Sequence, residues 1–196
     1  MYRTTVTSLM ILALASAIHS QANAQSSATA SPTAGEESFQ YSNPRIADFG
    51  KVVNLPEAAH QPREGSKIVV DITKGSDPDK LNSAIEKVCR FVNIYAGAGK
   101  NSADVRIAVV LHGDATLAVL NDAAYATRFK TNGNPSLACL RQLKDAGVDV
   151  FVCGQSLIGT GAKPSEVSDQ AKVAVSALTA LVNLQKDGYA YLPMLK

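Results

Sequence analysis

The sequence predicts an α/β domain in which helices cover both faces of a parallel or mostly parallel sheet. Strand-like and helix-like segments alternate over about 130 residues, which is an order typical of parallel sheets. One segment, Val105–Leu111, is a nearly continuous apolar run, as expected for a strand that is buried on both faces. The segment before it repeats its apolar residues at helical spacing, from Leu81 to Tyr95.

The domain is expected to open with a strand and a helix. The strand, Lys67–Thr73, is a short run rich in β-branched residues. Asp77 then suits the N-cap position of a helix, and Pro78 suits its first helical position. The apolar repeat continues to Tyr95, after which two glycines end the helix.

The rest of the domain continues the alternation. A helical stretch from Ala115 to about Phe129 follows the second strand, and Asn134 with Pro135 begins a further helix. Ser176 suits the cap of the last helix. The five expected strands span 67–73, 105–111, 148–152, 172–175 and 189–194, and the later helices span 115–129, 134–147 and 177–186.

Residues 1–24 have the pattern of a cleavable secretory signal peptide. Arg3 gives a positive start, Leu9–Ile18 is an apolar stretch too short to span a bilayer, and Ala22-Asn23-Ala24 matches the small-x-small cleavage pattern. The mature chain is then expected to begin at Gln25 and to act in the periplasm. The alternatives are an uncleaved anchor or a buried first helix, and no later stretch reaches transmembrane length.

Two further segments separate the signal peptide from the folded domain. Residues 25–40 are rich in Ser, Ala, Thr, Pro and Gly and are expected to form a flexible tether. Residues 41–65 carry Pro44, Pro56 and Pro62, which forbid a long helix, so we expect an extended arm on the domain or on a neighbouring subunit. The folded domain then comprises residues 66–196.

The composition excludes several classes of function. The chain has 19 Lys and Arg against 17 Asp and Glu, and this net charge of +2 gives no basic field for nucleic acid. Two of its three His lie outside the expected domain and its three Cys lack C-x-x-C spacing, so neither set predicts a metal site. The glycines form neither a G-x-G-x-x-G motif nor a phosphate-binding loop. We therefore expect no metal and no cofactor.

The candidate chemistry lies at the carboxyl ends of the strands, where open parallel sheets form their sites. Cys153 ends the third strand. If a helical turn begins directly after it, the backbone N–H groups of Gly154, Gln155 and Ser156 face the thiol and favour the thiolate. His112 ends the second strand at the same edge, where an imidazole is suited to orient a ligand or to tune a thiolate. The loops to search are Lys74–Asp77, His112–Asp114 and Cys153–Ser156.

Each of these residues also has a purely structural interpretation. Cys153 is small enough to fill the end of a buried strand, since free cysteine is commonly buried. His112 is equally compatible with a loop residue that caps or packs. Cys89 lies on the apolar stripe of the first helix and Cys139 lies beside an apolar face, so we interpret both as structural.

Three segments together resemble the DsrE/DsrF-like family, and the resemblance is closest to its exported members. They are LHGDATLAVL after the second strand, AGVDVFVCGQSL around Cys153, and SALTALVNLQKDGYAYL near the C-terminus. The resemblance covers roughly Ile68 to Leu192, and the upstream IADFGKVVNLPEAAHQP is similar to the arm of exported members. It implies a flavodoxin-like parallel sheet and a homo-oligomer, either a trimer or a hexamer.

The resemblance also implies a role for one cysteine. Several cytoplasmic members of the family relay sulfur as a cysteine persulfide, and their cysteine falls in an A-G-V-x-V-x-x-C context. Ala146-Gly147-Val148 and Cys153 match that context. The relay proteins often carry Arg-Gly soon after the helix that follows the cysteine, whereas this chain reads Ile158-Gly159-Thr160-Gly161.

Two functions from different classes are therefore expected. The first is an exported thiol protein of sulfur metabolism that accepts sulfane sulfur on Cys153 and passes it to a partner protein or a small thiol. The second is a non-enzymatic oligomeric module whose strand-edge pocket binds a small ligand, with Cys153 incidental. The reactivity of Cys153 relative to the other two thiols discriminates between them.

Overall fold

A five-stranded, all-parallel sheet forms the centre of the domain in the computed structural model, which describes residues 39–194. The strand order is β6-β5-β4-β3-β7, so the last strand lies beside the first strand of the sheet. This arrangement confirms the expected flavodoxin-like α/β fold class. The strands are β3 (Ser66–Ile72), β4 (Val105–Leu111), β5 (Asp149–Cys153), β6 (Lys172–Ala174) and β7 (Ala190–Met194).

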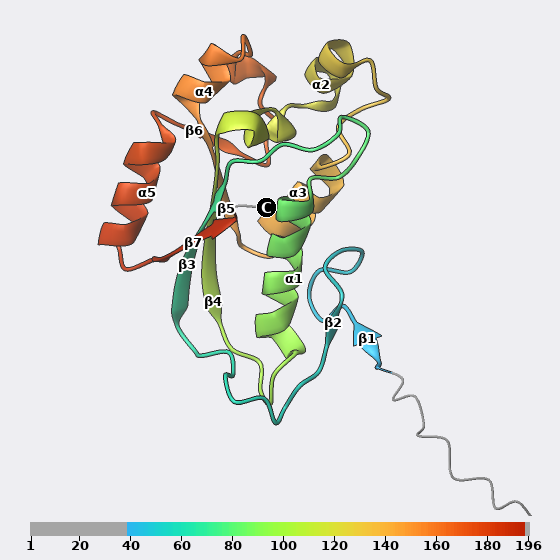
Figure 1. Ribbon diagram of the computed structural model, residues 1–196, viewed down its shortest axis with the longest axis vertical. Helices are drawn as coiled ribbons and strands as arrows, with labels where there is room; N and C mark the ends of the chain where they lie inside the picture. The colour runs from blue at the N-terminus through green and yellow to red at the C-terminus, as the bar shows by residue number, and fades with distance from the viewer. Residues whose placement is uncertain (1–38, 195–196) are drawn as a thin grey trace, which may run out of the picture. The chain divides into compact units, whose positions relative to one another are not determined.

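Helices cover both faces of this sheet (Figure 1). α1 (Ser83–Gly97) and α3 (Leu137–Asp145) cover one face, where alternate strand residues such as Val70 form the larger core. α5 (Ala177–Lys186) covers the opposite face, where Val69 belongs to a smaller core. Because successive side chains of a strand point to opposite faces, each central strand contributes to both cores.

Short elements follow the carboxyl ends of the strands. A small buried cluster formed by Leu120, Tyr125, Leu157 and Ala162 holds several of these elements together. They are η1 (Gly113–Val119), α2 (Asp122–Phe129), α4 (Gly154–Gly159) and η2 (Pro164–Glu166). No helix within residues 39–194 combines the length and the apolar character that crossing a membrane requires.

The expected start of the first helix is wrong, because Asn82 caps α1 in place of Asp77. The Asn82 Oδ1 accepts two N–H groups of the first turn, at 2.9 and 3.3 Å, and its Nδ2 donates to the Lys74 carbonyl at 2.9 Å. Asn82 is buried, so this cap also fixes the preceding loop. Asp77 instead lies in an exposed turn, where it pairs with Lys80 Nζ at 2.6 Å.

The expected helix over 115–129 consists of two elements, η1 and α2. Leu120 separates them, with an extended backbone (φ −63°, ψ 147°) that forms an antiparallel bridge with Val167. Asn121 then caps α2, since its Oδ1 accepts the Ala124 N–H at 2.9 Å. The bridge and the cap together explain why one helix does not continue through this region.

The arm carries a two-residue antiparallel pairing of β1 (Tyr41–Ser42) with β2 (Val52–Val53) and packs on α1. Asn93 of α1 is fully buried and makes the main polar contact. Its Oδ1 accepts the N–H groups of residues 45 and 46, and its Nδ2 donates to three arm carbonyls at 3.0–3.2 Å. Gly50 has φ +66°, and a Cβ there would collide with the backbone of Arg90, so only glycine permits this approach.

Candidate functional site

Cys153 is the last residue of β5 and the N-cap residue of α4. Its Sγ accepts a hydrogen bond from the Ser156 N–H at 3.4 Å, and its backbone is extended (φ −65°, ψ 114°). Gly154 is required by close packing, since a Cβ there would lie 2.8 Å from the Ala174 carbonyl oxygen of β6. Gln155 Nε2 donates to the Val175 carbonyl at 3.3 Å, which ties the first turn of α4 to the end of β6.

Two opposing influences act on the Cys153 thiol. Burial is the largest single influence. Cys153 is only 5% exposed, and this burial raises the pKa of its thiol. Hydrogen bonds from Ser156 and from the backbone N–H groups of Ala177 and Gln155 lower it, and together they leave the pKa of Cys153 below its ordinary value. N–H groups aimed at a sulfur stabilise its negative charge, so the site favours the thiolate.

His112 directly follows β4, the strand that pairs with the strand of Cys153. Leu111 pairs with Val152 in the β4–β5 ladder, so the residues that follow them, His112 and Cys153, occupy adjacent positions. His112 keeps an extended backbone (φ −153°, ψ −175°) and follows Val110 by two residues. Val110 and Cys153 both belong to the core under α5, and strand alternation therefore puts His112 on that same face.

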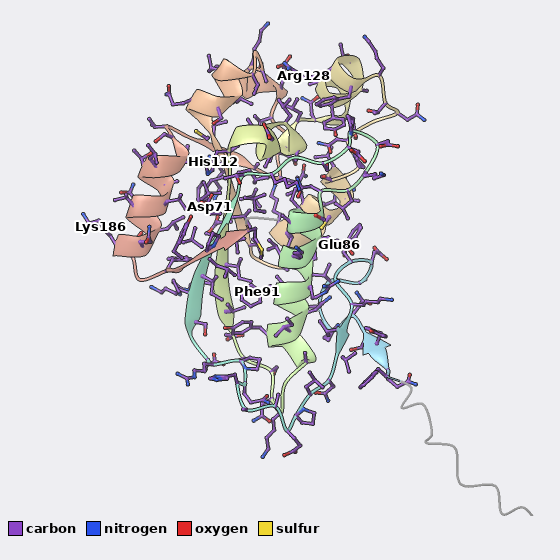
Figure 2. The ribbon with its side chains drawn as sticks, in the orientation of Figure 1. Asp71, Glu86, Phe91, His112, Arg128 and Lys186 are labelled. Carbon is purple, nitrogen blue, oxygen red and sulfur yellow. The ribbon has the colours of Figure 1, made fainter. Side chains whose placement is uncertain are left out.

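Two residues that the sequence did not single out complete the arrangement. The His112 Nε2 lies 2.9 Å from Asp71 Oδ1, and Tyr191 donates its hydroxyl to Asp71 Oδ2 at 2.7 Å. Figure 2 shows Asp71 and His112 close together on the α5 side of the sheet. The hydrogen bond to Asp71, followed by burial and the charge of that carboxylate, raises the pKa of Tyr191.

Asp71 of β3, His112 directly after β4, and Cys153 of β5 therefore lie on one face and near one edge of the sheet. Asp71 is only 8% exposed, and an acidic side chain at the end of an otherwise apolar strand was the available sequence signal for it. Tyr191 carried no such signal, because it reaches Asp71 only through the pairing of β7 with β3.

The other loops expected at this edge form a separate cavity of about 670 Å³. Lys74 and Asp77 contribute from one loop, Gly113 and Asp114 from the next, and Thr160 from the segment after α4. Cys153 is not among the residues that line it. The structure therefore brings two of the three predicted loops together and leaves the thiol on the α5 side.

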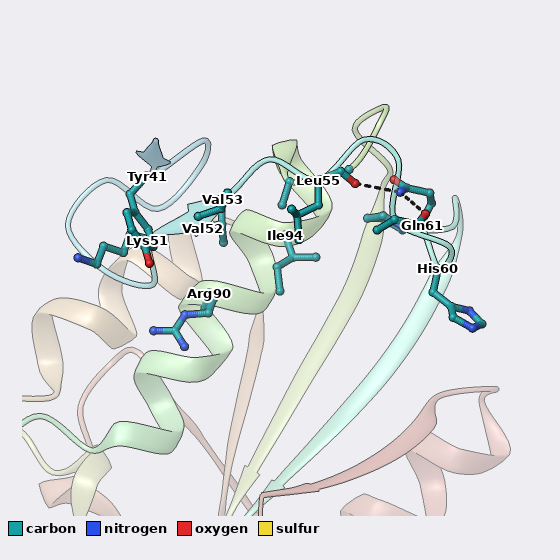
Figure 3. Close-up of a pocket in the computed structure, with 13 residues that line it drawn as sticks. Tyr41, Lys51, Val52, Val53, Leu55, His60, Gln61, Arg90 and Ile94 are labelled. Atoms are coloured by element: carbon teal, nitrogen blue, oxygen red, sulfur yellow. Dashed lines mark hydrogen bonds between the residues drawn. The ribbon is translucent and has the colours of Figure 1, made fainter. Parts of the chain in front are cut away.

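A second cavity, of about 480 Å³, lies between the arm and α1 (Figure 3). Leu55, Ile94 and Arg90 line it, and Gln61 Nε2 stabilises its rim by donating to the carbonyls of Leu55 (3.1 Å) and Ala58 (2.7 Å). None of its lining residues belongs to the thiol site. Within residues 39–194, no cluster of three or more His, Cys, Asp or Glu is arranged to hold a metal ion.

The model of the DsrE/DsrF-like family matches residues 67–194, and the chain belongs to this family. No curated protein matches the chain. Among solved structures, it is similar to the protein of unknown function MTH1491 from Methanobacterium thermoautotrophicum, with 20% sequence identity and a TM-score of 0.49. That match covers 65% of this chain and 98% of the other. Membership of the family suggests a role related to sulfur metabolism.

Proposed function

We propose that this chain is an exported sulfur carrier that accepts sulfane sulfur on Cys153 as a persulfide and passes it to a partner protein or a small thiol. The observation that carries the proposal is the position of Cys153 at the start of α4, where the Ser156 N–H donates to its Sγ and the surrounding donors lower the pKa of the thiol. A thiolate is the form that attacks sulfur. The family and the A-G-V-x-V-x-x-C context of Cys153 support the same role.

The transfer needs no external oxidant. The Cys153 thiolate attacks the outer sulfur of a donor persulfide, a bond forms between these two sulfurs, and the bond between the two donor sulfurs breaks. The donor leaves as a thiolate and takes up a proton. In this proposal His112, which directly follows the adjacent strand, exchanges the proton that Cys153 loses. Asp71 is the positioning residue that holds the imidazole ring, and the Tyr191 hydroxyl in turn donates to Asp71.

Intact mass after exposure to a persulfide donor such as glutathione persulfide tests the proposal. The wild-type protein should gain one sulfur atom, peptide mapping should place it on Cys153, and Cys153→Ser should gain none. Cys139→Ala, which removes a buried thiol, is the matched control and should still gain sulfur. A sulfur atom that stays with the Cys153→Ser protein would refute the relay role.

Export is part of the same proposal and rests on the signal-like sequence of residues 1–24, which lie outside the described residues. Protein isolated from its native host should begin at Gln25. A soluble cytosolic protein that retains Met1 would contradict export.

A non-enzymatic binding module is the second candidate. The cavity of about 670 Å³ at the carboxyl edge favours it, because Lys74, Lys80 and Asp77 supply polar groups at a place where open parallel sheets bind ligands. In that case Cys153 should be no more reactive than the other thiols.

A further inference from the structure

Two cysteines that the proposed transfer does not use meet between α1 and α3. Cys89 lies in the middle of α1 and Cys139 in the first turn of α3, and both are fully buried in the larger core. The Cys139 Sγ lies 3.9 Å from the carbonyl oxygen of Ile85, which precedes Cys89 by one helical turn. Side chains of a helix lean toward its N-terminus, so the Cys89 sulfur leans toward the turn that Cys139 contacts.

The Cys139 thiol also interacts with the Cys89 side chain. This interaction, together with burial, raises the pKa of Cys139 well above the usual range for a thiol. In the folded protein both thiols are therefore shielded from solvent, and Cys139 is in its unreactive protonated form.

We infer that Cys89 and Cys139 form a disulfide that links α1 to α3 when the chain folds in the presence of a disulfide oxidant. The inference rests on the packing of the two helices and stands independently of the function proposed for Cys153. α1 and α3 are in direct contact, and the Cys139 Sγ already reaches the turn of α1 that precedes Cys89, so the two sulfurs need only a short approach to bond. The bond would close a loop of about 50 residues, which restricts the unfolded chain.

The chemistry balances as two thiol–disulfide exchanges with a small disulfide such as oxidised glutathione. The thiolate of one cysteine attacks the small disulfide, forms a mixed disulfide and releases one small thiol. The second cysteine attacks the mixed disulfide, forms the Cys89–Cys139 bond and releases the second small thiol. Both cysteines are oxidised, the small disulfide is reduced, and the two protons end on the released thiols. Since both thiols are buried in the fold, the exchange takes place before α1 and α3 have packed.

Refolding the full chain with oxidised and reduced glutathione, followed by alkylation under denaturing conditions, tests the inference. The oxidised protein should weigh two hydrogen atoms less than the reduced protein and should accept a single alkyl group, on Cys153. Trypsin should release the peptide Val88–Arg90 joined to Thr131–Arg141. The oxidised protein should also melt about 10 °C above the reduced protein.

Two variants complete the test. Cys153→Ser should still form the link, and Cys139→Ala should not. Three free thiols after oxidative refolding, or a disulfide that contains Cys153, would overturn the inference. Because the mass and peptide measurements use the wild-type chain, the result does not depend on whether a variant folds.

Discussion

Cys153 combines two properties that usually oppose each other, because its side chain is nearly covered and yet its pKa is lowered. The hydrogen-bond donors that lower the pKa of Cys153 belong to Ser156 and Gln155 at the start of α4 and to Ala177 at the start of α5. The lowered pKa of this thiol therefore depends on how α4 and α5 approach the end of β5. Loss of that packing should return the pKa toward its ordinary value even if the cysteine remains.

The three thiols should differ in their reactivity toward alkylation. A lowered pKa means that Cys153 is ionised at a lower pH than an ordinary thiol, so its alkylation rate should reach half of its maximum at a lower pH than that of a free cysteine. The raised pKa of Cys139 should make it one of the last to react. A short pulse of iodoacetamide at a series of pH values, followed by peptide mass spectrometry, measures all three. If Cys153 is the slowest thiol in the folded protein, it is a packing residue and the binding module becomes the better interpretation.

The same titration on Asp71→Asn measures what the neighbouring imidazole contributes. Asp71 Oδ1 lies 2.9 Å from His112 Nε2 and holds the imidazole ring. The substitution removes the charged partner of this ring, so it should slow the alkylation of Cys153 while the fold, followed by circular dichroism, stays the same. An unchanged profile would limit Asp71 and His112 to a structural role.

The sequence predicted only the two site residues that come at the ends of expected strands, Cys153 and His112. Cys153 and His112 could be found because each comes directly after an apolar run and before a glycine. Asp71 and Tyr191 could not be paired in advance, because they are separated by 120 residues and meet only when β7 joins the sheet beside β3. Strand order is a property of the packed sheet, and no local pattern encodes it.

The positions of the strands were predicted more accurately than the residues at which the helices begin. The strands are apolar runs whose burial decides their position, and the expected segments overlap all five of them. Several residues near the start of a helix can often serve as its N-cap. Here both Asp77 and Asn82 are residue types that are preferred at that position. Asn82 caps α1 because tertiary contacts also hold it in place. It is buried, its side chain donates to the Lys74 carbonyl, and its backbone N–H donates to Ser136 Oγ at 3.2 Å.

Replacing the cap should destabilise the domain, and replacing the residue expected in its place should not. Asn82→Ala removes the acceptor of two N–H groups and a buried donor, so it should lower the free energy of unfolding by about 1–2 kcal/mol. Asp77→Ala breaks only an exposed ion pair and should leave the urea midpoint unchanged within error. Equal effects of the two substitutions would show that the Asn82 cap does not determine stability.

Exposed apolar side chains lie in two places on the molecule. On the arm, Tyr41 and Leu55 are exposed. Along β6 and α5, Val173, Val175, Leu178 and Val182 are all exposed. A cavity of about 500 Å³ lies between the same two elements.

An exposed apolar surface of this kind is typical of a protein–protein interface, and we predict a symmetric homo-oligomer, a trimer or a hexamer, that buries it. Leu178 and Val182 are four residues apart and share one side of α5, so the double substitution of both by Lys should put charges into the interface and give monomers. Light scattering at micromolar concentration, with circular dichroism to confirm the fold, measures the change. Leu55→Lys, at an exposed leucine of the arm, is the matched control and should leave the assembly intact. A monomeric wild-type chain, or an oligomer unaffected by the two charges, would show that this surface has another role.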